Sequence, residues 1–294
     1  MTPPPPPGVL YLVATPIGNL EDLTYRAARV LREVDLIACE DTRHSRILLD
    51  HYGIRRPTLS YYRENEAARS AEILRRLRGG ENVALVSDAG TPLLSDPGAR
   101  LVAEAVAAGL RVVPLPGPSA ALAALTASGI LDASGRGGEP VLLLGFFPQR
   151  AGLRRRQIQA WAAWPGVLVA FEAPHRLLAT LADLAEALGP ARRLVLAREL
   201  TKLHEEFLRG TATELLAVLR ERAARSPAAQ HDPGGAGLRG EFTLVVAPPP
   251  APAELPHALP PPALSRAELK RRAREAGLDR SELYRRLQQG KIKH

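Results

Sequence analysis

The chain has 294 residues, 46% of them hydrophobic, which is enough to fill two cores, so we expect two domains. Its single cysteine, Cys39, excludes an intramolecular disulfide and a cysteine-built zinc site, and the seven histidines show no paired spacing, so we expect no metal. The net charge is +8, and the segment 264–294 holds ten Lys/Arg against four Asp/Glu, which indicates either a polyanionic partner or a solvated helical face.

The first residues, MTPPPPPG, contain no basic stretch followed by an apolar core. They do not match a secretory signal, and we expect a proline-rich tail over residues 1–8. The longest apolar runs, such as 141–147, are far too short to cross a bilayer. A reducing compartment fits the cysteine content, so we expect a cytoplasmic protein.

Strand-like runs alternate with helical periodicity in the first part of the chain. The runs lie at residues 11–14, 35–39, 82–86 and 111–115. Between the first two runs, apolar residues fall on one face at helical spacing, at Leu23, Ala27, Val30, Leu31 and Val34. This alternation predicts an α/β domain with a parallel-rich sheet over residues 9–115.

A second series of strand-like runs follows, with helices in the gaps. These runs lie at residues 141–146, 167–171, 193–197 and 242–246. Two prolines and a glycine interrupt the pattern near residues 114–117, so we expect a second α/β domain over residues 116–247. The predicted fold class is therefore α/β, with two domains.

The remainder of the chain predicts a linker and a tail. Eight of the sixteen residues in 247–262 are proline, which predicts a stiff linker over residues 248–262. Residues 263–294 contain two capping-box patterns separated by Gly277, which predicts a small, basic helix-turn-helix-like hairpin. Such a hairpin either binds nucleic acid or docks on the parent domain, and we favour nucleic acid.

Three tight turns follow predicted strands: TPIGN at 15–19, SDAGTP at 87–92 and PGPSA at 116–120. In open α/β sheets, ligands bind outside the carboxyl ends of the strands. Glycine in each turn allows a close approach to the backbone, and Asp88 can accept hydrogen bonds from a ribose or an amine. Chain reversal alone explains any one turn, but three at strand ends favour a site. Because GxGxxG and GxxxxGK[ST] motifs are absent, the spacing predicts a cleft for a small polar ligand of open identity.

Longer motifs between about Val9 and Val246 add a family resemblance. They include LYLVATPIGNLEDLTYRA, EDTRHS, SDAGTPLLSDPG, GFFP, FEAPHRLL and LARELTKLHEEFLRG. Together they resemble the ribosomal RNA small-subunit methyltransferase I family, the RNA branch of the tetrapyrrole-methylase superfamily. The combination of SDAGTP with EDTRHS is specific, whereas PGPSA alone would indicate only the superfamily. The sequence departs from the family in its proline-rich flanks and an insertion over residues 225–238.

The resemblance implies two α/β domains of the tetrapyrrole-methylase type, with S-adenosylmethionine in the cleft between them, usually in a homodimer. It implies 2′-O-methylation of a cytidine in the decoding region of 16S ribosomal RNA. The substrate is either free RNA or the assembled small ribosomal subunit, and we favour the subunit. Its cofactor-binding positions correspond to Asp88, Thr91, Ser119, Ala120, Phe171, Ala197, Gly90 and Pro16. Asp88 is the strongest of these, and Phe171 is the weakest because an aromatic residue at a strand end is more often core.

Methyl transfer to a ribose hydroxyl needs positioning and a group that accepts the proton. Several charged residues lie where a predicted strand ends and a helix begins, beside the predicted cleft: Glu40, Asp41, Arg43 and His44. Asp41 is explained equally well as the N-cap of that helix. The resemblance adds Glu199 and Lys202, in ARELTK, as catalytic candidates.

Charged residues in the second domain and the tail are candidates for RNA contact. Glu172, His175 and Arg176 are explained by function or by a salt-bridge network, and His175 is left undecided. Candidate RNA-binding residues are Arg198, Arg266, Lys270, Arg271 and Arg285. With 4% aromatic residues, phosphate contacts and shape should dominate over base stacking, so binding should weaken with salt.

Two other functions compete with ribosomal RNA methylation. The shared scaffold would also permit a methyltransferase acting on a tetrapyrrole, against which the basic tail argues. A non-catalytic RNA-binding factor would use the cleft only for regulation, and the intact turns and charged residues argue against that reading.

Overall fold

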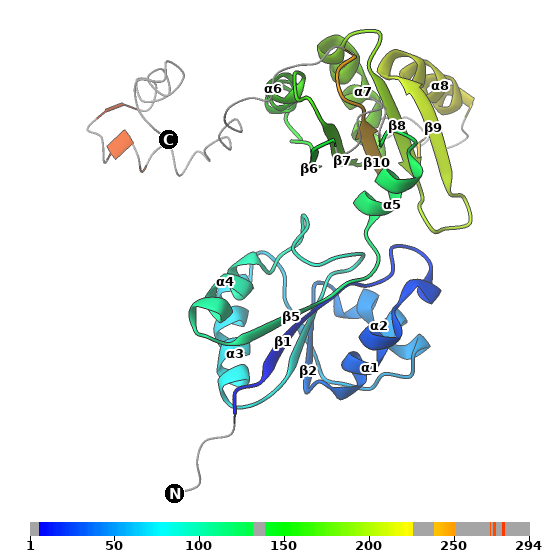
Figure 1. Ribbon diagram of the computed structural model, residues 1–294. Coiled ribbons are helices and arrows are strands. Elements are labelled where there is room, and N and C mark those ends of the chain that lie inside the picture. Colours follow the sequence, from blue (N-terminus) through cyan, green and yellow to red (C-terminus); the bar gives the residue numbers. More distant parts are fainter. Residues whose placement is uncertain are drawn as a thin grey trace, which may run out of the picture. The chain divides into compact units, whose positions relative to one another are not determined.

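The computed structural model describes residues 6–131, 139–225 and 238–250, together with Arg271, Ala273, Arg274, Leu278 and Asp279. Residues 1–253 and 254–294 form two separate compact units. Two five-stranded sheets lie in the first unit (Figure 1). Most of the predicted linker and hairpin lies outside the described residues, and the division between residues 115 and 116 stays a prediction. None of the described helices combines the length and apolar composition that a membrane span requires.

The first sheet is entirely parallel. In spatial order its strands are β3 (Thr58–Ser60), β2 (Leu36–Cys39), β4 (Val83–Val86), β1 (Val9–Val13) and β5 (Arg111–Leu115). The predicted strands of this domain are confirmed within two residues, and β3 is an additional strand. It is only three residues long, too short to carry an alternating pattern.

Helices cover both faces of this sheet. They are α1 (Tyr25–Glu33), α2 (Thr42–His51), α3 (Glu66–Arg78) and α4 (Ala99–Ala107). The first two pack with one set of strand residues, including Ile37 and Val86, and the last two pack with the alternate set, including Leu36 and Leu85. Strands buried on both faces read as continuous apolar runs, which is why the sequence located β2 and β4 so closely.

The connections create a crevice at the carboxyl edge of the sheet. The chain leaves β1 and β2 through α1 and α2 on one face, and leaves β4 through α4 on the other. Because β4 lies between β2 and β1, the connection that follows β4 leaves the sheet on the opposite face from the connections that follow its two neighbours. Ligands of open α/β sheets bind at such switch points, so this edge is where a site is expected.

The second sheet is mixed. In spatial order its strands are β6 (Val141–Phe146), β7 (Val167–Glu172), β10 (Phe242–Val246), β8 (Arg193–Arg198) and β9 (Glu206–Thr211). Only β6 and β7 pair in parallel, and the other pairs are antiparallel. The four predicted strands are confirmed, whereas β9 was missed because Glu206 and Arg209 interrupt its apolar pattern.

One face of the second sheet packs against α6 (Ala151–Trp161), α7 (Pro174–Leu188) and α8 (Ala212–Arg225). The other face packs against α5 (Ala120–Ala127), which begins at the last residue of the PGPSA turn. Ile17, from the TPIGN turn after β1, joins this second core beside Ala197 and Leu200. The first turn is thus anchored by burial of an apolar side chain.

Candidate functional site

The three predicted turns form one hydrogen-bonded edge. Thr15 N donates to Gly90 O at 2.9 Å, and Gly90 N donates to Thr15 O at 3.0 Å. Thr15 Oγ1 also donates to Ser87 O at 3.1 Å, and Thr91 Oγ1 donates to Pro118 O at 3.1 Å. The turns after β1, β4 and β5 therefore support one another rather than each simply reversing the chain.

Glycine is required where these turns pack together. Gly90 has a φ of +81°, and a Cβ there would lie 3.2 Å from Ile17 Cγ2. A Cβ at Gly117 would lie 3.0 Å from the Cβ of Ala14. The backbone of the second turn is thus left-handed, a conformation that glycine adopts at little cost, and the third turn lies directly against the end of β1.

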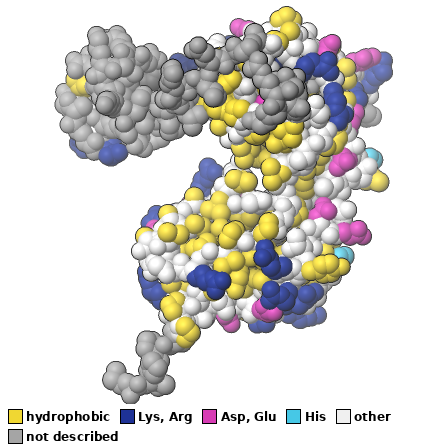
Figure 2. Space-filling view, viewed as in Figure 1, with side chains coloured by type: hydrophobic (Ala, Val, Ile, Leu, Met, Phe, Trp, Pro, Cys, Tyr) yellow, Lys and Arg dark blue, Asp and Glu magenta, His cyan; other side chains and the backbone are white. Residues whose placement is uncertain are grey.

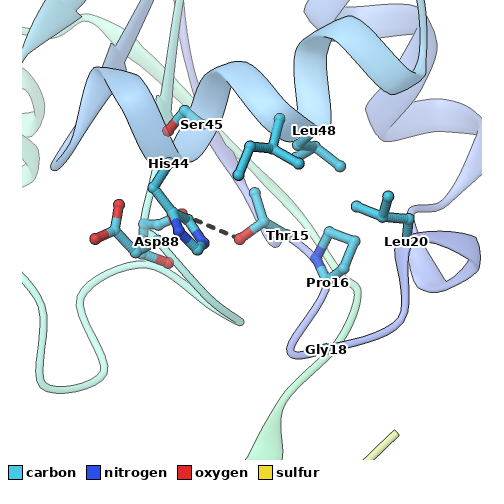
Figure 3. Close-up of a pocket in the computed structure, with 10 residues that line it drawn as sticks. Thr15, Pro16, Gly18, Leu20, His44, Ser45, Leu48 and Asp88 are labelled. Atoms are coloured by element: carbon cyan, nitrogen blue, oxygen red, sulfur yellow. Dashed lines mark hydrogen bonds between the residues drawn. The ribbon is translucent and has the colours of Figure 1, made fainter. Parts of the chain in front are cut away.

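A cavity of about 310 Å³ opens at this edge (Figure 3). Its lining residues come from the segment after β1, from α2 and from the turn after β4: Thr15, Pro16, Gly18, Leu20, His44, Ser45, Ile47, Leu48, Ser87 and Asp88. In Figure 3, His44 and Ser45 project from α2 on the side where Asp88 lies. The volume is at the lower end of the range of small-molecule sites, and the lining combines apolar walls with a carboxylate and hydroxyls, as such sites do.

The candidate residues before and within α2 have distinct roles. Asp41 is the N-cap of α2: its side chain accepts a hydrogen bond from Arg43 N at 2.8 Å and pairs with the Arg43 guanidinium at 2.9 Å. These contacts lower the pKa of Asp41 to about 2, so it is a weak proton acceptor. Burial and the charge of Asp88 instead raise the pKa of Glu40. Of the two neighbouring carboxylates, Glu40 is the better base.

One carboxylate at this edge was missed by the sequence analysis. Asp96 follows the SDAGTP turn in a loop where two non-glycine residues, Leu93 and Ser95, have φ values of 74° and 85°. Burial, followed by the charge of Glu40, raises the pKa of Asp96 to about 6. Strained backbone and a perturbed carboxyl group are both typical of functional sites. The second Ser-Asp pair in SDAGTPLLSDPG was the available signal in the sequence.

The predicted cofactor residues are divided between the two sheets. Asp88 and Pro16 line the cavity, Gly90 and Thr91 hold the turns together, and Ser119 caps α5 just before Ala120. On the second sheet, Phe171 is half-buried with its ring 5.4 Å from that of Phe146, and Ala197 is buried in the core. Their assignment to a cofactor stays a prediction, and of these eight residues only Asp88 and Pro16 line the cavity.

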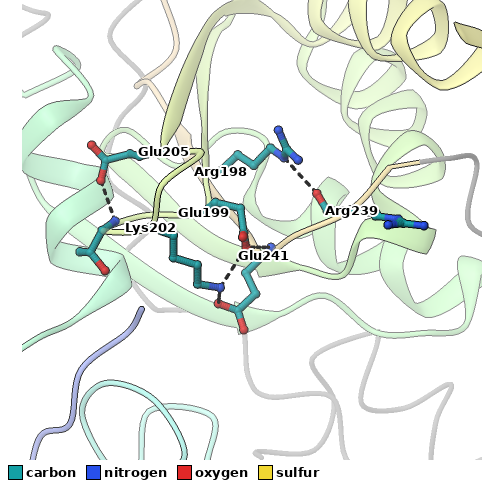
Figure 4. Close-up of polar contacts among 7 residues, drawn as sticks. Arg198, Glu199, Lys202, Glu205, Arg239 and Glu241 are labelled. Atoms are coloured by element: carbon teal, nitrogen blue, oxygen red, sulfur yellow. Dashed lines mark hydrogen bonds and ion pairs between the residues drawn. The ribbon is translucent and has the colours of Figure 1, made fainter. Parts of the chain in front are cut away.

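The ARELTK segment forms a strained turn after β8 that hydrogen bonds and ion pairs hold together (Figure 4). Glu199 and Thr201 have φ values of 50° and 66°, and Lys202 Nζ donates to Glu199 Oε1 at 2.9 Å and to Glu241 Oε2 at 3.0 Å. Burial opposes the charge of Lys202, but these two bonds raise its pKa overall. Burial also opposes the charge of Glu199, but hydrogen bonds from Glu241 N at 2.9 Å and from Lys202 Nζ lower its pKa overall. Both side chains therefore stay charged at neutral pH, and neither is a good general base.

A second cavity of about 570 Å³ lies beside this turn. It is lined by Gly18, Asn19, Leu20, Glu21, His51, Thr201, Lys202 and Leu203. Gly18 and Leu20 line both cavities, so the TPIGN turn separates them. A Cβ at Gly18 would lie 2.4 Å from Lys202 Cγ, so glycine is needed here for the two turns to meet.

The charged group after β7 is structural. Glu172 is 1% exposed, pairs with Arg176 at 2.6 Å, and accepts hydrogen bonds from Ala173 N at 2.8 Å and Thr180 Oγ1 at 2.5 Å. Arg176 also donates to Phe147 O at 3.0 Å. These contacts hold the start of α7 against the sheet, so the salt-bridge interpretation of Glu172 and Arg176 is correct.

The predicted RNA-binding residues are only partly visible. Arg198 donates to Arg239 O at 2.9 Å and lies 3.9 Å from Glu206, while Arg271 is an exposed helical residue of the second unit. Arg266, Lys270 and Arg285 lie outside the described residues. On the face shown in Figure 2, Lys and Arg side chains are scattered among hydrophobic ones over both sheet regions. In the described part of the chain, no group of three or more His, Cys, Asp and Glu residues is arranged to hold a metal ion.

Known proteins share this fold. The family model described as Tetrapyrrole (Corrin/Porphyrin) Methylases matches residues 9–216. Uroporphyrin-III C-methyltransferase from Thermus thermophilus, complexed with S-adenosyl homocysteine, is 18% identical with a TM-score of 0.56, over 82% of this chain and 97% of that one. A cobalt precorrin-4 methyltransferase is 16% identical with a TM-score of 0.56, over 81% of this chain and 94% of that one.

Curated relatives are much more similar in sequence. Ribosomal RNA small subunit methyltransferase I of Mesorhizobium japonicum is 47% identical over 247 residues, covering 84% of this chain and 78% of the relative. Its namesake in Pseudomonas aeruginosa is 51% identical over 198 residues, covering 67% and 68%. The chain therefore belongs to the ribosomal RNA small subunit methyltransferase I family of the tetrapyrrole methylases, and it is an S-adenosylmethionine-dependent methyltransferase.

Proposed function

We propose that this enzyme methylates the 2′-hydroxyl of a cytidine in the decoding region of 16S ribosomal RNA, with the assembled small subunit as substrate. The observation that carries the proposal is the 47% identity, across 84% of the chain, to a protein named ribosomal RNA small subunit methyltransferase I. The matched region is long enough to contain both sheets and the connected turns at the edge of the first.

The residues at the first-sheet edge fit S-adenosylmethionine. Asp88 offers a carboxylate to a cationic ligand, and the glycine backbone of the turns gives a ligand close access. Ser45 adds a buried hydroxyl without a nitrogen or oxygen partner among the described residues. We place the cofactor against these turns, held by Asp88 with Pro16, Gly90, Thr91, Ser119 and Ala120, and with Phe171 and Ala197 from the second sheet. When bound, it supplies an electrophilic methyl group on a sulfonium.

Glu40 is the proposed proton acceptor for the ribose hydroxyl. Its raised pKa brings it closer to the working pH than Asp41, whose pKa is about 2. The charged pair of Glu199 and Lys202 has the opposite character, because its hydrogen bonds stabilise the ionised forms. We assign that pair to positioning: it holds the strained turn beside the second cavity, from which the acceptor ribose would enter.

RNA contact, dimerisation and location complete the proposal. Arg198 and the basic segment 264–294 are the proposed phosphate contacts, so binding should weaken with salt. A second copy of the chain is the proposed occupant of the edge strand β6, where Val141 and Phe146 are 45% and 54% exposed. The proposed ribosomal RNA substrate supports a cytoplasmic location.

The direct test combines the full-length protein, S-adenosylmethionine with a labelled methyl group, and small ribosomal subunits from a strain that lacks this enzyme. We expect one labelled cytidine, with the label on the ribose 2′-oxygen. Naked 16S ribosomal RNA and a porphyrinoid serve as parallel substrates. Transfer to the porphyrinoid and not to RNA would contradict the proposed function, and equal transfer to naked RNA would contradict the assembled subunit as substrate.

A further inference from the structure

The turn after β8 holds an apolar side chain in solvent at the second cavity. Leu203 is 93% exposed and lines this cavity. Leu200, three residues earlier, is buried at 7% exposure in the same core as Ile17. Single exposed hydrophobic residues are common on protein surfaces. Leu203 differs from these because it lines a cavity and follows a residue that anchors the turn.

Hydrogen bonds fix the conformation of this turn. Thr201 N donates to Glu205 Oε2 at 2.7 Å, and Lys202 N donates to Glu199 O at 3.0 Å. With the two bonds from Lys202 Nζ, they hold Glu199 and Thr201 in left-handed conformations, which are costly for residues other than glycine. Leu203 is therefore presented in one position, and little entropy is lost in ordering the turn when a ligand binds.

The other segment that lines the cavity carries a carboxylate without a partner. Glu21 belongs to the short 3-10 helix η1 (Leu20–Asp22). This helix is held by Glu21 N, which donates to Asn19 Oδ1 at 3.1 Å, and by Tyr52 OH, which donates to Leu20 O at 2.6 Å. Within the described part of the chain, the Glu21 carboxylate forms no hydrogen bond or ion pair. It is therefore available to a hydrogen-bond donor in the cavity.

The charges around the cavity argue against a phosphate group inside it. Among the described residues that line it, Lys202 is the one lysine or arginine, and its ammonium already binds the carboxylates of Glu199 and Glu241. With Glu21, three carboxylates surround this one ammonium, and even a protonated His51 would leave the balance negative. An anion is repelled by such a site, whereas a neutral ring with hydrogen-bond donors is not.

We propose that the second cavity binds the nucleobase of the acceptor nucleotide. The inference rests on the proposed ribosomal RNA substrate. Leu20 and Leu203 supply apolar contact to the base, and Glu21 accepts a hydrogen bond from its exocyclic amino group. Of the two common pyrimidines of RNA, only cytosine has that group, at N4, and glutamate is a known acceptor for it. Glu21 is thus a specificity-determining residue.

The glycine between the two cavities accounts for the placement of the ribose. Gly18 lines both cavities, and it is exposed. A base in the second cavity puts its ribose over Gly18, where no side chain intervenes, and so beside the turns at which we place the cofactor. The 2′-hydroxyl then lies on the cofactor side of Gly18, while the phosphates stay outside the negatively charged cavity.

Small subunits in which the acceptor cytidine is replaced by uridine test the role of Glu21. The wild-type enzyme should methylate the cytidine subunit with a kcat/KM about tenfold or more above that for the uridine subunit. Glu21→Gln should reduce this ratio to about threefold or less, because an amide can also donate to O4 of uridine. Glu33→Gln, on the exposed surface of α1 where Glu33 pairs with Arg29, is the matched control and should keep the wild-type ratio.

Two results would overturn the proposal. One is equal methylation of the cytidine and uridine subunits by the wild-type enzyme, and the other is an undiminished ratio in Glu21→Gln. If the wild-type enzyme transfers no methyl group to either subunit, the proposed function fails as well. Methylation of the cytidine subunit with an undiminished ratio in Glu21→Gln refutes the base site alone.

A second variant tests the apolar contact. Leu203→Ala should raise KM for small subunits about three- to tenfold, because part of a leucine side chain is no longer buried against the base. Val106→Ala, at a position 62% exposed on α4, is the matched control and should keep the wild-type KM. Affinity for S-adenosylmethionine, measured by titration calorimetry on the full-length protein, should stay at the wild-type value in Leu203→Ala and Glu21→Gln. An unchanged KM in Leu203→Ala, or loss of cofactor affinity in either variant, would contradict a base in this cavity.

Discussion

Carboxylates at strand ends have opposite roles in the two sheets. After β7, Glu172 is buried, and both of its oxygens have partners within the protein. After β2 and β4, Glu40 and Asp88 are partly exposed. The negative charge of Asp88 contributes to the raised pKa of Glu40, and the charges of both contribute to the raised pKa of Asp96. A buried carboxylate whose oxygens all have partners holds the fold together, whereas partly exposed carboxylates with perturbed pKa values are typical of binding sites. A carboxylate at a strand end is therefore structural in the second sheet, whereas in the first sheet we propose a functional role for it.

The largest expected effect is on stability, at the second sheet. Glu172→Gln removes the buried charge that pairs with Arg176, and breaking a buried pair costs about 3–5 kcal/mol. We expect a strong fall in the midpoint of thermal or urea unfolding. Protein that remains folded should bind S-adenosylmethionine with wild-type affinity. Normal stability with impaired S-adenosylmethionine binding in Glu172→Gln would show that Glu172 is functional and not structural.

The largest expected effect on catalysis is at Glu40. Glu40→Gln removes the proposed proton acceptor, so kcat for methylation of small subunits should fall about 100-fold. The affinity for S-adenosylmethionine, measured by calorimetry, should change less than kcat. Asp41→Asn is the matched control, because asparagine also caps a helix, and its kcat should stay within about threefold of wild type. A larger loss of kcat in Asp41→Asn than in Glu40→Gln would indicate that Asp41, and not Glu40, is the proton acceptor.

A smaller effect on stability is expected at the start of α2. Asp41→Ala removes the side chain that accepts a hydrogen bond from Arg43 N, and the loss of an N-cap costs about 1 kcal/mol. Urea unfolding should show this loss for Asp41→Ala but not for Asp41→Asn. If both variants lose the same stability, the carboxylate charge rather than the cap is what matters.

The smallest predicted effect has the opposite sign. The pKa of Asp96 is about 6 in the folded protein, above its unfolded value, so folding is favoured while Asp96 is protonated and disfavoured once it ionises. Asp96→Asn removes this penalty, and without cofactor the unfolding midpoint at pH 7.5 should rise by about 1–3 °C. At pH 4, where Asp96 is protonated in the native state, the gain should disappear. A lower unfolding midpoint for Asp96→Asn at pH 7.5 would show that the ionised carboxylate of Asp96 has stabilising partners in the folded protein, as that of Glu172 does.

The sequence predicted the frame of the first sheet well, because buried parallel strands appear as short apolar runs before helical periodicity. It missed β9, whose single partner β8 leaves it at an edge where Glu206 and Arg209 are tolerated. It located the three turns but not the bonds that connect them, since Thr15 and Gly90 are far apart in the chain. Asp96 was overlooked because it lies in a loop whose left-handed residues, Leu93 and Ser95, are not glycine, so the local sequence does not indicate the loop's conformation.

The central claim is that the cofactor lies at the carboxyl edge of the first sheet, against the three connected turns and Asp88. A crystal structure of the full-length protein with S-adenosylhomocysteine tests it most directly. We predict ligand density in contact with the turns at residues 15–19, 87–92 and 116–120, with Asp88 in hydrogen-bond contact. Density bound elsewhere, with Asp88 left facing solvent, would contradict the account.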